Sequence, residues 1–168
     1  AVIVATGTIE KKLGIPGEKE FFAKGVSSCA VCDGGFFKGQ PMAIIGGGNS
    51  ALEEALYLSS ITNKVYVVHR RNEFRADQIL VDRIKENPHI EIVTPYIPVE
   101  IKGDKMVSSL LLQNVKTDEI KEIKVNALFA YIGSDSNTSF ISIPEVLNEK
   151  GYIITNSEME TVVPGLFA

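Results

Sequence analysis

Cys29 and Cys32 are the only cysteines of this 168-residue chain, and they lie three positions apart in the segment SSCAVCDGGFF, residues 27–37. A C-x-x-C pair suits reversible disulfide chemistry, because the short ring tolerates both redox states and one thiol can be held as a thiolate. Two buried structural thiols and half of a zinc site are the alternatives. Zinc needs about four ligands, and the spacing of His69 and His89 gives no reason for them to converge on the cysteines. A redox pair is therefore the interpretation we favour.

Asp33 directly follows the second cysteine. Exchange between thiols and disulfides must move protons, and a carboxyl group at this position could donate or accept one. The same residue precedes Gly34 and Gly35, and an Asp before two glycines is also a turn former. Catalysis and a turn both remain open for Asp33, and catalysis is the prediction we carry forward.

A glycine-rich segment, MAIIGGGNSALEEA, begins ten residues after Cys32. Gly46, Gly48 and Ala51 match the G-x-G-x-x-G/A pattern of dinucleotide-binding loops, with an apolar run before the loop and a helical period after it. The first glycine allows a tight turn, the second lets the backbone approach a pyrophosphate, and Ala51 permits close packing of the helix on the sheet. A glycine-rich turn without a ligand is the alternative. The predicted contact residues are Gly46, Gly47, Gly48, Asn49, Ser50, Ala51 and Glu54.

A basic segment predicts which nucleotide is bound. In an NAD site an acidic residue ends the second strand and binds the ribose 2′-hydroxyl. Here the apolar run Val65–Val68 leads into His69, Arg70 and Arg71, with Arg75 four residues later. Guanidinium groups suit a phosphate on that hydroxyl, which predicts NADP(H). A solvated basic turn is the alternative, and His69 by itself is more typical of a packing or hydrogen-bonding residue than of a catalytic one.

A nicotinamide site and a dithiol in one chain indicate electron transfer between them. Nicotinamide carries electrons as hydride, and a disulfide takes up two electrons and protons. A flavin usually mediates between the two, and the sequence contains no second dinucleotide fingerprint.

Hydrophobic periodicity predicts the elements that position these motifs. Apolar strands at residues 42–45, 65–68 and 90–94 alternate with helices at 49–61 and within 75–86, which predicts a β-α-β-α-β unit with a parallel sheet. The faces expected to be buried consist of Leu52, Ala55, Leu56 and Ser59 in the first helix, and Ile79, Leu80, Arg83 and Ile84 in the second.

After residue 94 the hydrophobic pattern changes to that of consecutive extended segments. Segments 99–102, 107–115 and 120–125, joined by turn sequences, predict an antiparallel meander, and 128–132 predicts a last apolar strand. The predicted class is α/β, a Rossmann-like three-layer nucleotide-binding domain with an inserted antiparallel β-meander, the FAD/NAD(P)-binding fold.

Both ends of the chain are expected to belong to a second domain. Val2–Ala5 is a short β-branched run, and the chain stops after the apolar pair Leu166–Phe167 and Ala168. The polar segment 133–139 predicts a linker. The expected division is 1–8 in the second domain, 9–132 as the nucleotide domain, 133–139 as the linker and 140–168 as a return into the second domain.

The composition predicts small molecules and proteins as partners. The net charge is −4 with mixed signs, so neither nucleic acid nor membrane is expected. No apolar run approaches the roughly 18 residues that span a bilayer, and no basic region precedes the N-terminal apolar stretch as in a signal peptide. We expect a cytoplasmic protein.

The segments ATG, CAVCDG, GGGNSALEEA, HRRNEFRA, YIG and TVVPGLFA occur in the order and spacing of bacterial low-molecular-weight thioredoxin reductases, which the chain resembles over almost its whole length. The resemblance implies an NADPH domain that carries the C-x-x-C, inserted into a split FAD domain and joined to it by a pair of short strands. The full enzyme would use NADPH and FAD, reduce thioredoxin and form a homodimer. This chain by itself is expected to lack FAD and turnover.

The resemblance also implies roles for individual residues. Cys29 and Cys32 would form the redox disulfide, Asp33 would donate the proton, residues 46–51 would bind the pyrophosphate, and the three arginines already named would bind the 2′-phosphate. The chain departs from the G-x-x-P-N-T hinge of the family, because Ser136 replaces the proline. A flavoprotein reductase partner of a peroxiredoxin and a non-catalytic NADPH-binding redox sensor are the alternative functions.

Overall fold

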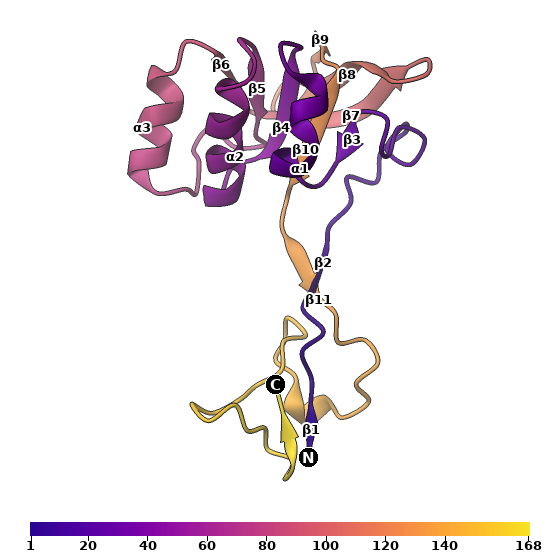
Figure 1. The fold of residues 1–168 in the computed structure, drawn as a ribbon, viewed down its shortest axis with the longest axis vertical. Coiled ribbons are helices and arrows are strands. Elements are labelled where there is room, and N and C mark those ends of the chain that lie inside the picture. Colours follow the sequence, from indigo (N-terminus) through magenta and orange to yellow (C-terminus); the bar gives the residue numbers. More distant parts are fainter. The chain divides into compact units, whose positions relative to one another are not determined.

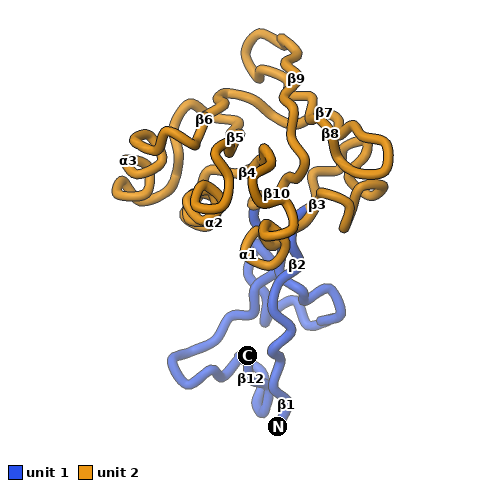
Figure 2. Tube along the Cα trace, turned by 45° about the horizontal axis from the view of Figure 1, so that its top comes forward, with its two compact units in different colours: residues 1–11, 133–168 blue, residues 12–132 orange.

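The computed structural model describes residues 1–168, and the chain divides into two compact units (Figure 2). Residues 1–11 and 133–168 form unit 1, and residues 12–132 form unit 2. Unit 2 contains all the predicted site residues.

A five-stranded parallel sheet is the centre of unit 2 (Figure 1). Its order is β3-β10-β4-β5-β6, with bounds Val26–Ser27, Ala127–Tyr131, Met42–Gly46, Val65–Val68 and Ile90–Val93. Every residue of β4 is buried, as expected for a central strand that is covered on both faces. The predicted β-α-β-α-β unit is thus confirmed.

Two apolar clusters pack on opposite faces of this sheet because side chains alternate along a strand. Ile44 and Val67 join one cluster with residues of the helices α2 (Asn49–Ser59) and α3 (Gln78–Glu86). Ala43 and Ile45 join the other with residues of β7 (Tyr96–Gly103), β8 (Val107–Asn114) and β9 (Ile120–Lys124). Helices, parallel sheet and meander form the three predicted layers.

The antiparallel meander is also confirmed, with strand order β7-β8-β9. Its first strand begins at Tyr96 and not at Val99, because the pairing with β8 extends back to Tyr96 opposite Asn114. The short elements β3, α1 (Ala30–Asp33) and η1 (Gly34–Phe37) were not predicted. Each has two to four residues, too few for a periodic pattern to be recognised.

The predicted buried faces of the helices need correction. In α2, Ala51, Leu52, Ala55 and Leu58 are buried, whereas Leu56 and Ser59 are only partly covered. In α3, Leu80, Val81 and Ile84 are buried, while Ile79 is 69% exposed and Arg83 is exposed as well. The sequence period was right and its phase was wrong, because the phase depends on how the helix rests on the sheet.

Unit 1 is built from two short strand pairs. β1 (Val2–Ile3) pairs in parallel with β12 (Leu166–Phe167), and β2 (Thr8–Glu10) pairs antiparallel with β11 (Ser134–Ser136). The segment predicted as a linker therefore contains a strand, and the pair of short strands that the resemblance implied is present. A 3-10 turn, η2 (Pro144–Val146), completes the unit. No helix of the chain has the length and apolar character needed to cross a membrane.

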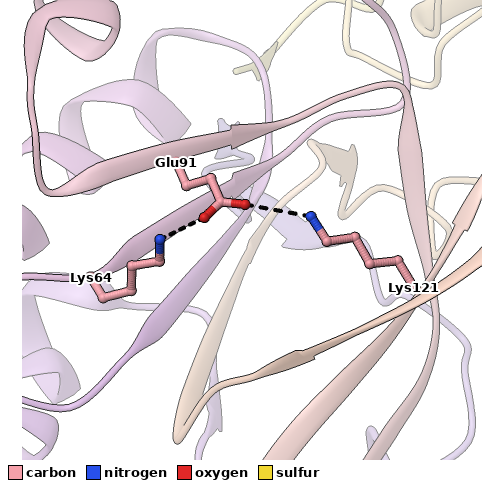
Figure 3. A network of polar contacts seen from close by, with 3 residues as sticks. All are labelled: Lys64, Glu91 and Lys121. Atoms are coloured by element: carbon pink, nitrogen blue, oxygen red, sulfur yellow. Dashed lines mark hydrogen bonds and ion pairs between the residues drawn. The ribbon is translucent and has the colours of Figure 1, made fainter.

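An ion-pair network connects the parallel sheet to the meander in unit 2 (Figure 3). The Glu91 carboxylate of β6 accepts hydrogen bonds from Lys64, just before β5, and from Lys121 of β9 at 3.4 Å. The hydrogen bond from Lys64 is the main cause that lowers the pKa of Glu91, and the same bond raises the pKa of Lys64. Each side chain is about two-fifths exposed, so water screens the network.

Glu91→Gln is expected to lower the free energy of unfolding at pH 7 by about 0.2–1 kcal/mol for each partly exposed pair. The folded-state pKa of Glu91 is depressed, so its contribution is present above the unfolded-state pKa and is lost as the pH falls through the folded-state value. Urea unfolding at pH 7 and at pH 3 measures this. Glu119→Gln, an exposed carboxylate outside any ion pair, is the control. A difference between variant and wild type that does not become smaller from pH 7 to pH 3 would contradict the assignment.

Candidate functional site

The two cysteines form a disulfide at the start of α1. Cys29 caps the helix, its Cα lies 5.3 Å from that of Cys32, and its Sγ accepts a hydrogen bond from the Cys32 N–H at 3.2 Å. No cluster of three or more His, Cys, Asp or Glu side chains is arranged to hold a metal ion. The disulfide lies at a helix N-terminus, where backbone N–H groups can stabilise a thiolate after reduction.

Asp33 lies next to the disulfide and is fixed by Ser27. The Ser27 hydroxyl donates to Asp33 Oδ2 at 2.6 Å and accepts a hydrogen bond from the Cys29 N–H at 3.1 Å. The Asp33 N–H in turn donates to the Cys29 carbonyl at 3.1 Å. The predicted proton donor is thus held beside the redox pair. Ser27 was missed in the sequence, where its only signal is its position two residues before Cys29.

The disulfide helix α1 packs directly on α2, the helix that follows the glycine loop. Ala30 is fully buried in the same cluster as Leu52 and Leu58. A Cβ at Gly34 would lie 2.6 Å from Leu58 Cδ2, so only glycine allows this close approach without displacing that side chain. The redox pair and the predicted nucleotide loop therefore belong to one packed body.

The three glycines of the loop between β4 and α2 have different surroundings. A Cβ at Gly46 would lie 2.5 Å from the Tyr131 carbonyl oxygen and 2.9 Å from Ala51 Cβ, and one at Gly47 would lie 2.5 Å from the His69 ring. A Cβ at Gly48 would meet nothing within 4 Å. Gly46 therefore permits strand and helix to pack closely, while Gly48 presents open backbone at the N-terminus of α2. This is the arrangement that a bound pyrophosphate requires.

Gly48 is the N-cap residue of α2, so Gly48→Ala is expected to lower the stability by no more than about 1 kcal/mol. It is expected to weaken NADPH binding about tenfold or more, which is 1.4 kcal/mol. The new methyl group enters open space in the protein, at the place where a pyrophosphate would approach. Gly46→Ala is the matched variant, expected to destabilise the fold by about 1–3 kcal/mol through overpacking. Urea unfolding and calorimetric titration with NADPH separate the two effects. Equal loss of stability in both variants would contradict this division of roles.

The arginine segment is held against the glycine loop. The Arg75 N–H donates to the Gly47 carbonyl at 2.8 Å, while Arg70 and Arg71 follow the end of β5. All three arginines are exposed, and none takes part in the ion pairs of the chain. Their guanidinium groups are therefore available to an anionic ligand beside the loop.

Asn49 has a structural partner that the sequence did not indicate. Its side-chain amide donates to Asp77 Oδ2 and its side-chain carbonyl accepts from the Asp77 N–H, both at 2.8 Å. Asp77 caps α3, so the pair joins the first residue of α2 to the end of the arginine segment. Asn49 is thus placed to fix the shape of the site, and Ser50 lies exposed beside it.

His69 packs beneath the glycine loop. Its ring stacks on Phe74 with centroids 5.6 Å apart, and its Nε2 is buried without a hydrogen-bond partner. Burial is the main cause that lowers the pKa of His69, and the charges of the neighbouring arginines lower it further. A neutral imidazole at pH 7 fits the packing interpretation considered for this residue.

Glu54 points to the disulfide segment. The Val31 N–H donates to its carboxylate, which lowers the pKa of Glu54, but burial first and the nearby Glu53 second have the opposite effect and the pKa is raised overall. Its Oε2 is buried and has no hydrogen-bond partner. Of the predicted nucleotide contacts, Glu54 is the one that the structure connects to α1.

Comparisons with known proteins agree with this geometry. The family model described as "Pyridine nucleotide-disulphide oxidoreductase" matches residues 1–168. The chain is 45% identical to a thioredoxin reductase of Helicobacter pylori and 47% identical to one of Rickettsia prowazekii, in each case over 100% of this chain and 56% of the relative. It therefore spans little more than half the length of these curated relatives.

Solved structures with similar coordinates are also thioredoxin reductases. That of Lactococcus lactis has a TM-score of 0.91 at 45% identity, covering 98% of this chain and 55% of that protein. That of T. acidophilum has a TM-score of 0.90 at 36% identity, with coverage of 98% and 55%. The family match over every residue, together with a disulfide packed on the helix that follows the glycine loop, shows that the chain belongs to the pyridine nucleotide-disulphide oxidoreductases.

Proposed function

We propose that this chain is the NADPH-binding, disulfide-bearing part of a thioredoxin reductase. One observation carries the proposal: a disulfide packs on the helix whose N-terminus offers open glycine backbone, and a segment with exposed arginines outside any ion pair is hydrogen-bonded to the same glycine loop. The open space at Gly48 and the unpaired Arg70 and Arg71 fit a pyrophosphate and a 2′-phosphate. The likeness to thioredoxin reductases along the whole chain supports the choice of substrate.

The nucleotide-binding residues act by holding and orienting. The backbone of Gly48 and the free N–H groups at the start of α2 bind the pyrophosphate, and Arg70, Arg71 and Arg75 bind the 2′-phosphate. The Asn49–Asp77 pair keeps the arginine segment in place. A bound NADPH would supply a hydride, and FAD in the complete enzyme would supply the chemistry that links this hydride to the electron pair that a disulfide accepts.

The disulfide-bearing residues exchange electrons with the partner protein. Reduction of Cys29–Cys32 takes two electrons and two protons and yields two thiols, and the Asp33 carboxylate, which accepts a hydrogen bond from Ser27, lies where it can transfer a proton to or from them. One thiolate then attacks the disulfide of thioredoxin and forms a mixed disulfide, and the other thiolate attacks that bond. Thioredoxin leaves as a dithiol, and Cys29–Cys32 is again a disulfide. Both cysteines of the chain serve this pair, which supports a function in the reducing cytoplasm.

Calorimetric titration of the 168-residue chain tests nucleotide binding. We expect NADPH to bind and NADH to bind much more weakly. The same chain is expected to leave the disulfide of thioredoxin unreduced when NADPH is added, since it spans only 56% of the length of its relatives. The complete reductase, supplied with FAD, is expected to reduce thioredoxin. Absence of NADPH binding would refute the proposal, and NADPH binding without thioredoxin reduction by the complete protein would favour a redox sensor.

A further inference from the structure

The backbone at the start of the disulfide helix is held by side chains from two other elements. The N–H groups of two successive residues, Cys29 and Ala30, donate to Ser27 Oγ of β3 and Tyr131 Oη of β10, respectively. The turn that contains the disulfide is therefore attached to the fold through its amides.

The hydrogen bond from Ala30 N–H to Tyr131 Oη is 2.9 Å long and joins residues 101 positions apart. Ala30 is fully buried, so water cannot replace the hydroxyl as an acceptor. Tyr131 also lies opposite Gly46 in the parallel sheet, and its carbonyl oxygen would be 2.5 Å from a Cβ at that glycine. One residue thus contacts both the disulfide turn and the nucleotide loop.

We propose that Tyr131 is a positioning residue whose hydroxyl holds the Cys29–Cys32 turn in its disulfide conformation and thereby sets the redox equilibrium of the pair. The inference rests on the proposed redox function and concerns a hydroxyl whose hydrogen bond is made with the backbone of the turn. The ring closed by the disulfide holds the turn in the geometry in which the Ala30 N–H donates to the Tyr131 hydroxyl. Reduction opens this ring and removes the constraint, so the hydrogen bond stabilises the disulfide more than the dithiol.

Tyr131→Phe removes this hydroxyl and keeps the ring. We expect the equilibrium constant for reduction of the disulfide to rise by about 2- to 10-fold, and a tenfold change corresponds to about 30 mV for this two-electron couple. Equilibration of the 168-residue chain with dithiothreitol redox buffers, followed by thiol counting, measures the constant. Tyr96→Phe, which removes a hydroxyl from β7 in the same unit, is the matched control and is expected to leave it unchanged. An unchanged constant in Tyr131→Phe, or an equal change in the control, would overturn the inference.

A second measurement tests the same hydrogen bond in the wild-type chain. Amide hydrogen exchange of wild-type Ala30 is expected to be slow in the disulfide form and at least several-fold faster in the dithiol form, because the hydrogen bond weakens when the ring opens. Equal protection in both forms would overturn the role of Tyr131 and leave the proposed function intact. If dithiol buffers cannot open the wild-type disulfide reversibly, both the role of Tyr131 and the proposed redox function would be overturned.

Discussion

The Arg70→Ala, Arg71→Ala double variant is expected to bind NADPH about 10²- to 10⁴-fold more weakly than wild type, with little change in its affinity for NADH. Each charge-assisted hydrogen bond to the 2′-phosphate contributes about 1.5–3 kcal/mol, and every 1.4 kcal/mol is a tenfold change in affinity. The two guanidinium groups are exposed and outside every ion pair of the chain. Their removal should therefore leave the fold unchanged.

Calorimetric titration with both nucleotides checks this expectation. Arg83→Ala is the matched control, because Arg83 is an exposed arginine on α3, away from the glycine loop. Weaker binding at higher salt would accompany a phosphate contact. Equal losses of affinity for NADPH and NADH would show that the arginines do not recognise the 2′-phosphate.

Cys32→Ser is expected to abolish thioredoxin reduction by the complete reductase, because a single thiol cannot complete the exchange that releases the partner. In the 168-residue chain, wild type should show no free thiols before reduction and two afterwards, in agreement with the Cys29–Cys32 disulfide and the absence of other cysteines. NADPH binding should persist in the variant, since Cys32 does not belong to the glycine loop.

Ser28→Ala, a substitution in the same segment that keeps both sulfur atoms, is the control for this variant and should retain thioredoxin reduction. Thiol counting and thioredoxin-dependent oxidation of NADPH are the two readouts. Turnover that survives in Cys32→Ser would mean that the disulfide is structural and that electrons reach thioredoxin by another route.

The sequence by itself determined the parts that depend on local pattern. Buried parallel strands are continuous apolar runs, and glycines at Gly46 and Gly48 between a strand and a helix have a narrow physical meaning. Local pattern predicted the strands β4, β5 and β6, the meander and the disulfide pairing. The structure contains all of them. These features require information from neighbouring residues only.

The tertiary structure decided which distant residues complete the site. Ser27 reaches Asp33, Asn49 reaches Asp77 across 28 positions, and Tyr131 reaches Ala30 across 101. The order of strands in the sheet places β10 between β3 and β4, and this order brings the end of β10 to both the disulfide turn and the glycine loop. Periodicity contains no information on such neighbours, because it describes the spacing of buried positions along an element and not which element covers them. The same limit explains why the buried face of α3 was predicted with the right spacing and the wrong phase.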